Sequence, residues 1–146
     1  MPLFTSKVNY ALRALLDLAA QPAGRPAQSR EIAARQDIPE SYLNQLLVVL
    51  RRAGLIRSVR GAAGGYVLGR EPHRLTAADV VEALHGQDFL GEMAGDASQV
   101  PAAWVTRNLH NRLNEAVRQE LERTTLADLV AEVHRLDEAQ SLMLGL

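Results

Sequence analysis

Apolar side chains recur every three or four positions along most of this 146-residue chain. That spacing places them on one face of an α-helix, whereas a half-buried strand would alternate apolar and polar residues. The pattern predicts helices over 8–19, 29–36, 39–53, 76–85 and 103–123, and a last helix from 125 onward. Two prolines and a glycine within 21–26 predict a loop between the first two helices. The chain is therefore expected to be mostly α-helical.

Residues that favour helix ends stand at the limits of these patterns. Thr76 with Asp79, and Thr125 with Asp128, have the spacing of a capping box, in which the two residues satisfy free N–H groups at a helix start. The other signals are Ser29 as the cap of the second helix, Pro39 in the first position of the third, and Gly54 and Gly86 at helix ends. The predicted helices thus have defined ends.

Two short β-prone runs, at 55–59 and 66–68, interrupt the helical pattern. The sequence Arg-Gly-Ala-Ala-Gly-Gly between them, at 60–65, suits a tight turn because glycine tolerates positive φ. Upstream, the helices over 29–36 and 39–53 are separated only by a short turn, as in a helix-turn-helix. Together these features predict a winged helix-turn-helix fold in which the hairpin is the wing.

Charge divides the chain into two unlike halves. Residues 1–75 hold eleven Lys and Arg against five Asp and Glu, a net of +6, whereas residues 76–146 carry a net of −7, so the whole chain sums to −1. A basic region can neutralise nucleic-acid phosphates, and an acidic region is repelled by them. We expect the first half to contact double-stranded DNA and the second half to serve protein contacts.

Composition excludes several other classes. The chain has no cysteine, which excludes disulfides, thiol redox sensing and any cysteine-ligated zinc or iron-sulfur centre. Its longest apolar runs, such as 46–50, are far shorter than the roughly 20 residues that a membrane helix needs. Residues 1–10 lack the pattern of a secretory leader. A cytoplasmic protein with no membrane span, metal or cofactor is the expectation.

The third predicted helix has one apolar and one polar face. Leu43, Leu46, Leu47 and Leu50 are expected in the core, which leaves the polar side chains of the first turns outside. In a helix-turn-helix this part of the second helix enters the major groove. Amide side chains suit adenine, and hydroxyl groups suit phosphates. The candidate DNA contacts are Ser41, Tyr42, Asn44 and Gln45, and an ordinary solvated helix face is the alternative.

Arginine and lysine side chains add further candidate contacts. Arg60 begins the glycine-rich turn of the wing, from which a guanidinium can enter a narrow minor groove. Other basic residues would bind phosphates without reading sequence, unless they serve only solubility. They are Lys7, Arg51, Arg52 and Arg57.

The helix predicted over 103–123 is too long for a small winged domain to cover. Its apolar stripe is expected to pair with a second copy of the chain, and packing within one chain is the alternative. The expected dimer-interface residues are Val105, Leu109, Leu113, Val117 and Leu121. The last helix is expected to bury Leu126, Leu129, Val130, Val133 and Leu136. The chain would thus divide into a DNA-binding domain at 1–86, a connecting loop at 87–102 and a dimerisation region at 103–146.

Several segments, taken in order, resemble one known family. They are Leu-Phe-Thr-Ser-Lys at 3–7, Tyr-Ala-Leu-Arg at 10–13, Ile-Pro-Glu-Ser-Tyr-Leu-Asn-Gln-Leu-Leu at 38–47, Arg-Ala-Gly-Leu at 52–55, Ser-Val-Arg-Gly at 58–61 and Gly-Gly-Tyr at 64–66. From residue 3 through the last helix the chain resembles the Rrf2 family of bacterial repressors. The resemblance implies a winged-helix homodimer with a long dimerisation helix, bound to palindromic operators.

Within that family, some members carry an iron-sulfur cluster on three cysteines in the loop before the long helix. This chain has no cysteine between 87 and 102 and so resembles the cluster-free branch. Members of that branch respond to protein partners, small molecules or unidentified signals, which implies an unidentified effector or protein partner for this chain.

Other readings of the chain stay open beside this one. A protein-interaction module would use the acidic half, with DNA contact secondary. An enzyme is disfavoured because no nucleophile, base and orienting residue stand at a known spacing. The four histidines fit no metal motif, although His110 could join Glu92 or Asp96 in a ligand site. Trp104, the one tryptophan, is expected in the core, with a small-molecule pocket as the alternative.

Overall fold

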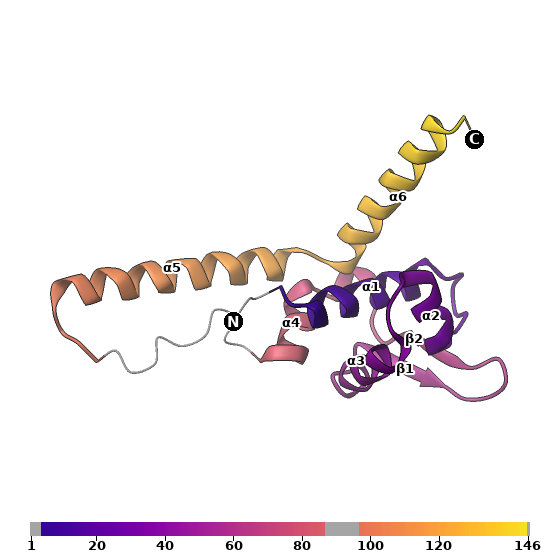
Figure 1. The fold of residues 1–146 in the computed structure, drawn as a ribbon, viewed down its shortest axis with the longest axis horizontal. Coiled ribbons are helices and arrows are strands. Elements are labelled where there is room, and N and C mark those ends of the chain that lie inside the picture. Colours follow the sequence, from indigo (N-terminus) through magenta and orange to yellow (C-terminus); the bar gives the residue numbers. More distant parts are fainter. Residues whose placement is uncertain (1–3, 87–96, 146) are drawn as a thin grey trace.

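The computed structural model describes residues 4–86 and 97–145 (Figure 1). Its elements in chain order are α1 (Ser6–Ala20), α2 (Ser29–Gln36), α3 (Glu40–Arg52), β1 (Ile56–Val59), β2 (Gly65–Leu68), the short 3₁₀ helix η1 (Pro72–Arg74), α4 (Ala77–His85), α5 (Pro101–Arg123) and α6 (Leu126–Met143). The predicted fold class, a mostly helical winged helix-turn-helix, is confirmed. Among residues 4–86 and 97–145, none of the helices combines the length and the hydropathy of a membrane span.

One core lies around α1, which packs against α2, α3, α4, β2 and the start of α6. The apolar face predicted for α3 is confirmed, because Leu43, Leu46, Leu47 and Leu50 are all buried. Burying a leucine side chain contributes about 1.5–3 kcal/mol. These four residues therefore fix the side on which α3 meets the core, and with it the side that α3 presents to solvent.

The wing is a two-stranded antiparallel hairpin in which Arg57 pairs with Val67 and Ser58 with Tyr66. A third chain segment extends it, since the Ala27 N–H donates to the Tyr66 carbonyl at 3.0 Å and the Tyr66 N–H to the Ala27 carbonyl at 2.8 Å. A Cβ atom on Gly65 would lie 2.5 Å from the Ala27 carbonyl oxygen. Glycine at 65 therefore lets the wing attach to the loop between α1 and α2.

The junction between α5 and α6 lies inside the winged domain. The Leu126 N–H donates to the Leu75 carbonyl at 2.7 Å, and the Ala77 N–H donates to the Thr124 carbonyl at 2.8 Å. Leu126 is 1% exposed and belongs to the same core cluster as α1 and α3. The capping boxes predicted at the starts of α4 and α6 are both present.

Several predicted helix starts are off by one or two residues. Ser29 is the first helical residue rather than the cap of α2, and the Gln28 N–H donates to Glu31 Oε1 at 3.0 Å. Pro39 is the cap of α3 rather than its first residue, because its carbonyl already accepts from the Leu43 N–H at 2.9 Å. Pro101, expected in the connecting loop, is the first residue of α5. Proline suits both positions because neither requires its N–H group.

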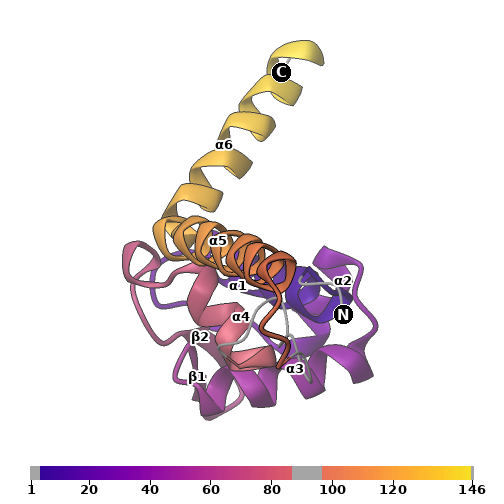
Figure 2. The ribbon, with the colours of Figure 1, turned by 90° about the vertical axis from the view of Figure 1, so that its left-hand side faces the viewer.

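Beyond the winged domain the two last helices diverge. In Figure 1, the end of α5 meets the body while the rest of the helix extends away from it, and α6 leaves at an angle; Figure 2 shows the same projection of α6 when the molecule is viewed along α5. Two expectations are wrong for the single chain. Val133 and Leu136 of α6 are 38% and 66% exposed rather than buried, and Trp104 is 60% exposed with the Arg107 guanidinium 5.1 Å from its ring centre.

The turn between α2 and α3 has an unusual backbone. Asp37 has φ 54° and ψ 53°, and it is the one non-glycine residue with positive φ in the described ranges. We expect Asp37→Val to lower the free energy of unfolding by about 1–2 kcal/mol, because a β-branched side chain clashes in this left-handed conformation. Asp37→Asn, which removes the same charge but tolerates the conformation, is expected to match the wild type. Urea unfolding monitored by circular dichroism measures both, and equal stability of the two variants contradicts the argument.

Candidate nucleic-acid interface

The polar face of α3 carries three of the predicted contacts side by side. Ser41, Asn44 and Gln45 are exposed, and their spacing of three and four residues puts them on one face of the helix. The leucines on the opposite face are buried. The structure thus exposes one hydroxyl and two amide groups to solvent near the N-terminal end of α3.

Tyr42 occupies a different position from its neighbours. It is partly buried, and its ring meets the Tyr10 ring edge-on with 5.6 Å between centroids and 79° between planes. A hollow of about 120 Å³ is lined by Lys7, Tyr42, Gln45, Leu46, Val49 and Leu84. The structure therefore brings three predicted contacts, from α1 and α3, to one depression.

The arginines extend this surface to both sides. Arg51 and Arg52 are exposed in the last turn of α3, Arg57 is exposed on β1, and Arg60 is exposed in the turn of the wing. No ion pair joins these four side chains to a carboxylate among residues 4–86 and 97–145. They are available to neutralise phosphates.

α3 and the wing lie on a common side of the molecule. In both Figure 1 and Figure 2, α3 and β1 lie on the side away from α6. Arg57 also lines a hollow of about 360 Å³ between the wing and the α1–α2 loop, beside Arg25. The elements that carry the polar and basic candidates therefore lie on one side of the molecule, whereas α6 projects in the opposite direction.

Close packing shapes the turn that carries Arg60. A Cβ atom on Gly64 would lie 2.1 Å from the Val59 carbonyl oxygen, and the Gly64 N–H donates to the Gly61 carbonyl at 3.0 Å. No larger residue fits at 64 unless the turn opens. The glycines predicted to serve positive φ thus also serve the tight closure of the wing, which holds Arg60 at the start of the turn.

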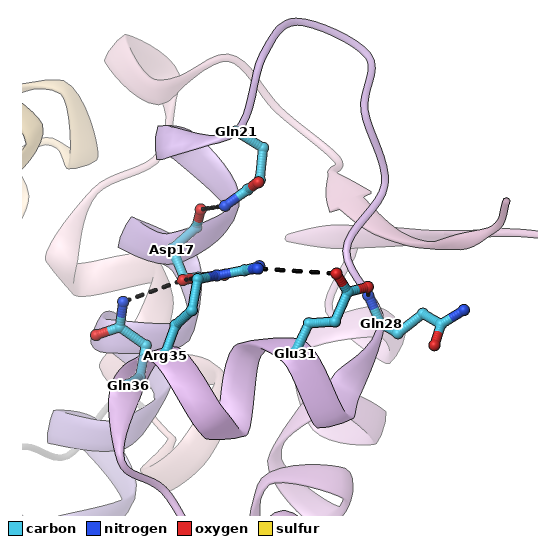
Figure 3. Close-up of polar contacts among 6 residues, drawn as sticks. All are labelled: Asp17, Gln21, Gln28, Glu31, Arg35 and Gln36. Atoms are coloured by element: carbon cyan, nitrogen blue, oxygen red, sulfur yellow. Dashed lines mark hydrogen bonds and ion pairs between the residues drawn. The ribbon is translucent and has the colours of Figure 1, made fainter.

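A polar network that the sequence analysis missed joins α1 to α2 (Figure 3). Asp17 is 3% exposed, and its two carboxylate oxygens accept from Arg35 Nε and Nη2, each at 2.9 Å. Gln36 Nε2 donates to the same carboxylate at 3.1 Å, and Arg35 also lies 3.8 Å from Glu31. A lone aspartate within the apolar pattern of α1 was the available signal, since a buried carboxylate requires partners.

The electrostatics of this network favour a fixed charge on Arg35. Its hydrogen bond to Asp17 raises the pKa of the Arg35 guanidinium above its ordinary value, with smaller contributions from the charges of Asp17 and Glu31. A planar guanidinium that makes two parallel bonds to a carboxylate also fixes direction. The network therefore fixes the orientation in which α2 packs against α1. Because α3 follows α2 after a short turn, the orientation of α3 depends on it as well.

The dimer residues expected on α5 fall into two groups. Val105, Leu109 and Leu113 are 67%, 47% and 52% exposed and form a stripe on the outer face. Val117 and Leu121 are partly buried against Val8 and Val81 of the chain's own core. The apolar stripe of α5 is thus covered by the chain's own domain near the end of the helix and is uncovered nearer its start.

The pair of helices α2 and α3, joined by a tight turn and followed by the β1–β2 wing, defines a winged helix-turn-helix DNA-binding protein. Residues 4–132 match the Rrf2 family, which is described as an iron-dependent transcriptional regulator. The chain belongs to the Rrf2 family of transcriptional regulators.

Relatives are similar in sequence to this chain over nearly its whole length. The transcriptional regulator CymR of Bacillus subtilis is 38% identical over 135 residues, which cover 92% of this chain and 94% of CymR. The solved structure of CymR, titled as the global cysteine regulator of that bacterium, matches with a TM-score of 0.76 at 39% identity, covering 88% of this chain and 95% of that one. The structure of an IscR from T. potens matches with a TM-score of 0.73 at 36% identity over 88% and 86%.

The family description names iron, and the residues present do not fit a cysteine-held iron centre. The chain has no cysteine. In the part of the chain that the structure describes, no three His, Asp or Glu side chains come together as metal ligands. Glu92 and Asp96, the partners considered for His110, lie outside the described residues.

Proposed function

We propose that the chain is a homodimeric repressor that binds a palindromic operator and needs no iron-sulfur cluster. The observation that carries the proposal is that Ser41, Asn44 and Gln45 on α3 and Arg60 on the wing are all exposed, on two elements of the basic half that lie on one side of the molecule. Each subunit would insert the start of α3 into the major groove and Arg60 into the adjacent minor groove. A bacterial regulator with this role works in the cytoplasm.

The uncovered apolar stripe of α5 supports the dimer. Three large apolar residues at 105, 109 and 113 leave water only if another surface covers them. A second copy is the occupant we propose, because the stripe runs along one side of a long helix and the same patch on an identical helix can cover it in a two-fold pair. The two α3 helices would then face half-sites about one or two helical turns apart, at roughly 34 Å per turn.

The decisive experiment is binding of the purified, metal-free protein to the DNA upstream of its own gene. Fluorescence anisotropy is measured against a scrambled competitor at two salt concentrations. Tight binding that resists the competitor supports the proposal. Weak binding that disappears at the higher salt concentration contradicts a metal-free regulator of that operator, because phosphate contacts alone behave in this way.

We expect Gln45→Ala and Arg60→Ala each to weaken operator binding by about 1–3 kcal/mol, since each removes a proposed base-edge or minor-groove contact. Binding of Gln45→Ala to scrambled DNA should stay unchanged, because an amide contributes little to phosphate attraction. Competition anisotropy measures both affinities. Equal operator affinity of wild type and variants removes these two residues from the interface.

Arg51→Ala is the matched control, because it removes a basic side chain from the far end of the same helix. It should weaken binding to operator and scrambled DNA equally and lower the slope of log K against log salt by about 1. A selective loss of operator binding in Arg51→Ala would assign it to base recognition instead.

A further inference from the structure

One face of α1 contacts both helices of the helix-turn-helix. Tyr10, Arg13 and Asp17 stand at spacings of three and four residues, so they form a row along that face. We call these three residues the α1 row. Asp17 binds Arg35 and Gln36 of α2, as described above. The other two residues make contacts that the proposed function does not use.

Tyr10 contacts the start of α3. Its ring meets Tyr42 edge-on at 5.6 Å, a geometry in which two aromatic rings attract each other. Tyr42 lies between Ser41 and the pair Asn44 and Gln45, in the first turns of α3. The orientation of the Tyr10 ring therefore affects the part of α3 that carries the exposed polar side chains.

Arg13 links Tyr10 to the end of α2. Its guanidinium carbon lies 5.3 Å from the centre of the Tyr10 ring, within the range of a cation–π interaction. Arg13 Nη2 also donates a hydrogen bond to the carbonyl of Gln36, the last residue of α2. One side chain of α1 thus touches the end of α2 directly and the start of α3 through one ring.

We infer that Tyr10 and Arg13 are positioning residues for operator choice, which they set without contact with bases; this inference rests on the proposed function. Reading a base edge requires the amides of Asn44 and Gln45 to lie within a fraction of an ångström of their partners. Attraction to phosphates tolerates much larger displacements, since it depends on charge and not on direction. Loosening the α1 row should therefore lower sequence preference and leave non-specific affinity intact.

The test uses two duplexes. Wild-type protein first enriches one duplex from a random pool, and a scrambled version of that duplex serves as the non-specific probe. Tyr10→Leu and Arg13→Met should weaken binding to the enriched duplex about 3- to 10-fold, the range that one aromatic or cation–π contact contributes. Binding to the scrambled duplex should change by less than about twofold, with an unchanged salt slope. Tyr10→Phe, which keeps the ring, should bind like the wild type.

A double-mutant cycle identifies the route. If Tyr10 acts through Tyr42, then Tyr10→Leu combined with Tyr42→Leu should be no weaker than Tyr42→Leu alone. Additive losses overturn the inference. A parallel loss on both duplexes in Arg13→Met, with a smaller salt slope, also overturns it, because that result makes Arg13 a phosphate contact.

A control variant for the effect of lowered stability is available in the same helix. Leu16→Ala removes a partly buried side chain of α1 outside the row, so it should lower the unfolding temperature without changing the ratio of the two affinities. A changed ratio in Leu16→Ala would mean that any weakening of the fold alters specificity, which overturns a specific role for the α1 row. If wild-type protein enriches no duplex, the proposed function itself fails, a result distinct from all of these.

Discussion

Placing glutamate at both Leu109 and Leu113 is expected to convert the protein to a monomer and to weaken operator binding at least about 100-fold. Both side chains are half exposed on the outer stripe of α5, where a second copy is proposed to pack. Four carboxylates would then face one another across the interface, and like charges at a buried seam cost several kcal/mol. Light scattering after gel filtration measures the mass, and anisotropy measures the affinity.

The control places a glutamate elsewhere on α5. Asn111 is exposed and stands at no three- or four-residue spacing from Val105, Leu109 or Leu113, so Asn111→Glu should stay dimeric and bind the operator. If the Leu109 and Leu113 variant stays dimeric, the dimer interface lies on another surface, and the exposed side of α6 is the candidate.

Replacing Asp17 with alanine is expected to lower the free energy of unfolding by about 2–3 kcal/mol, which corresponds to a fall of roughly 5–10 °C in Tm. The change removes a nearly buried carboxylate and leaves the Gln36 amide without this acceptor. Arg35 is 40% exposed and can turn toward water, so the loss stays below that of a fully buried pair. Differential scanning calorimetry measures the shift.

A surface pair provides the comparison. Glu120→Ala breaks an exposed contact with Arg123 three residues along α5 and should change stability by less than about 0.5 kcal/mol. If Asp17→Ala were equally mild, the network in Figure 3 would not hold α2 against α1.

The sequence predicted the fold correctly where hydrophobic periodicity or a glycine indicated an element or a turn. Four leucines fixed the inner face of α3, and the polar residues between them had to lie outside. The third segment of the wing could not be found in this way, because Ala27 contributes a single bridging residue with no period of its own. The partners of Asp17 were equally hidden, since Arg35 is 18 positions away and only the fold brings them together.

Amphipathic patterns also leave one question unanswered in principle. They show which face of a helix is apolar, and they do not show whether the same chain or another covers it. Val117 and Leu121 meet their own domain, whereas Leu113, four positions from Val117 on the same helix, faces solvent. Val133 and Leu136 of α6 were expected to be buried for the same reason, and in one chain they are not.

The burial of Leu126 in the core of the winged domain limits where this chain can be truncated or fused to another protein. Leu126, which follows α5, packs beside Leu75 in the same core cluster as the buried leucines of α3. A fragment that stops at α4 would carry an empty leucine-sized hole there, at a cost of several kcal/mol. The DNA-reading half is therefore not a portable unit, and a gene fusion that transferred it would have to carry α5 and the start of α6 along.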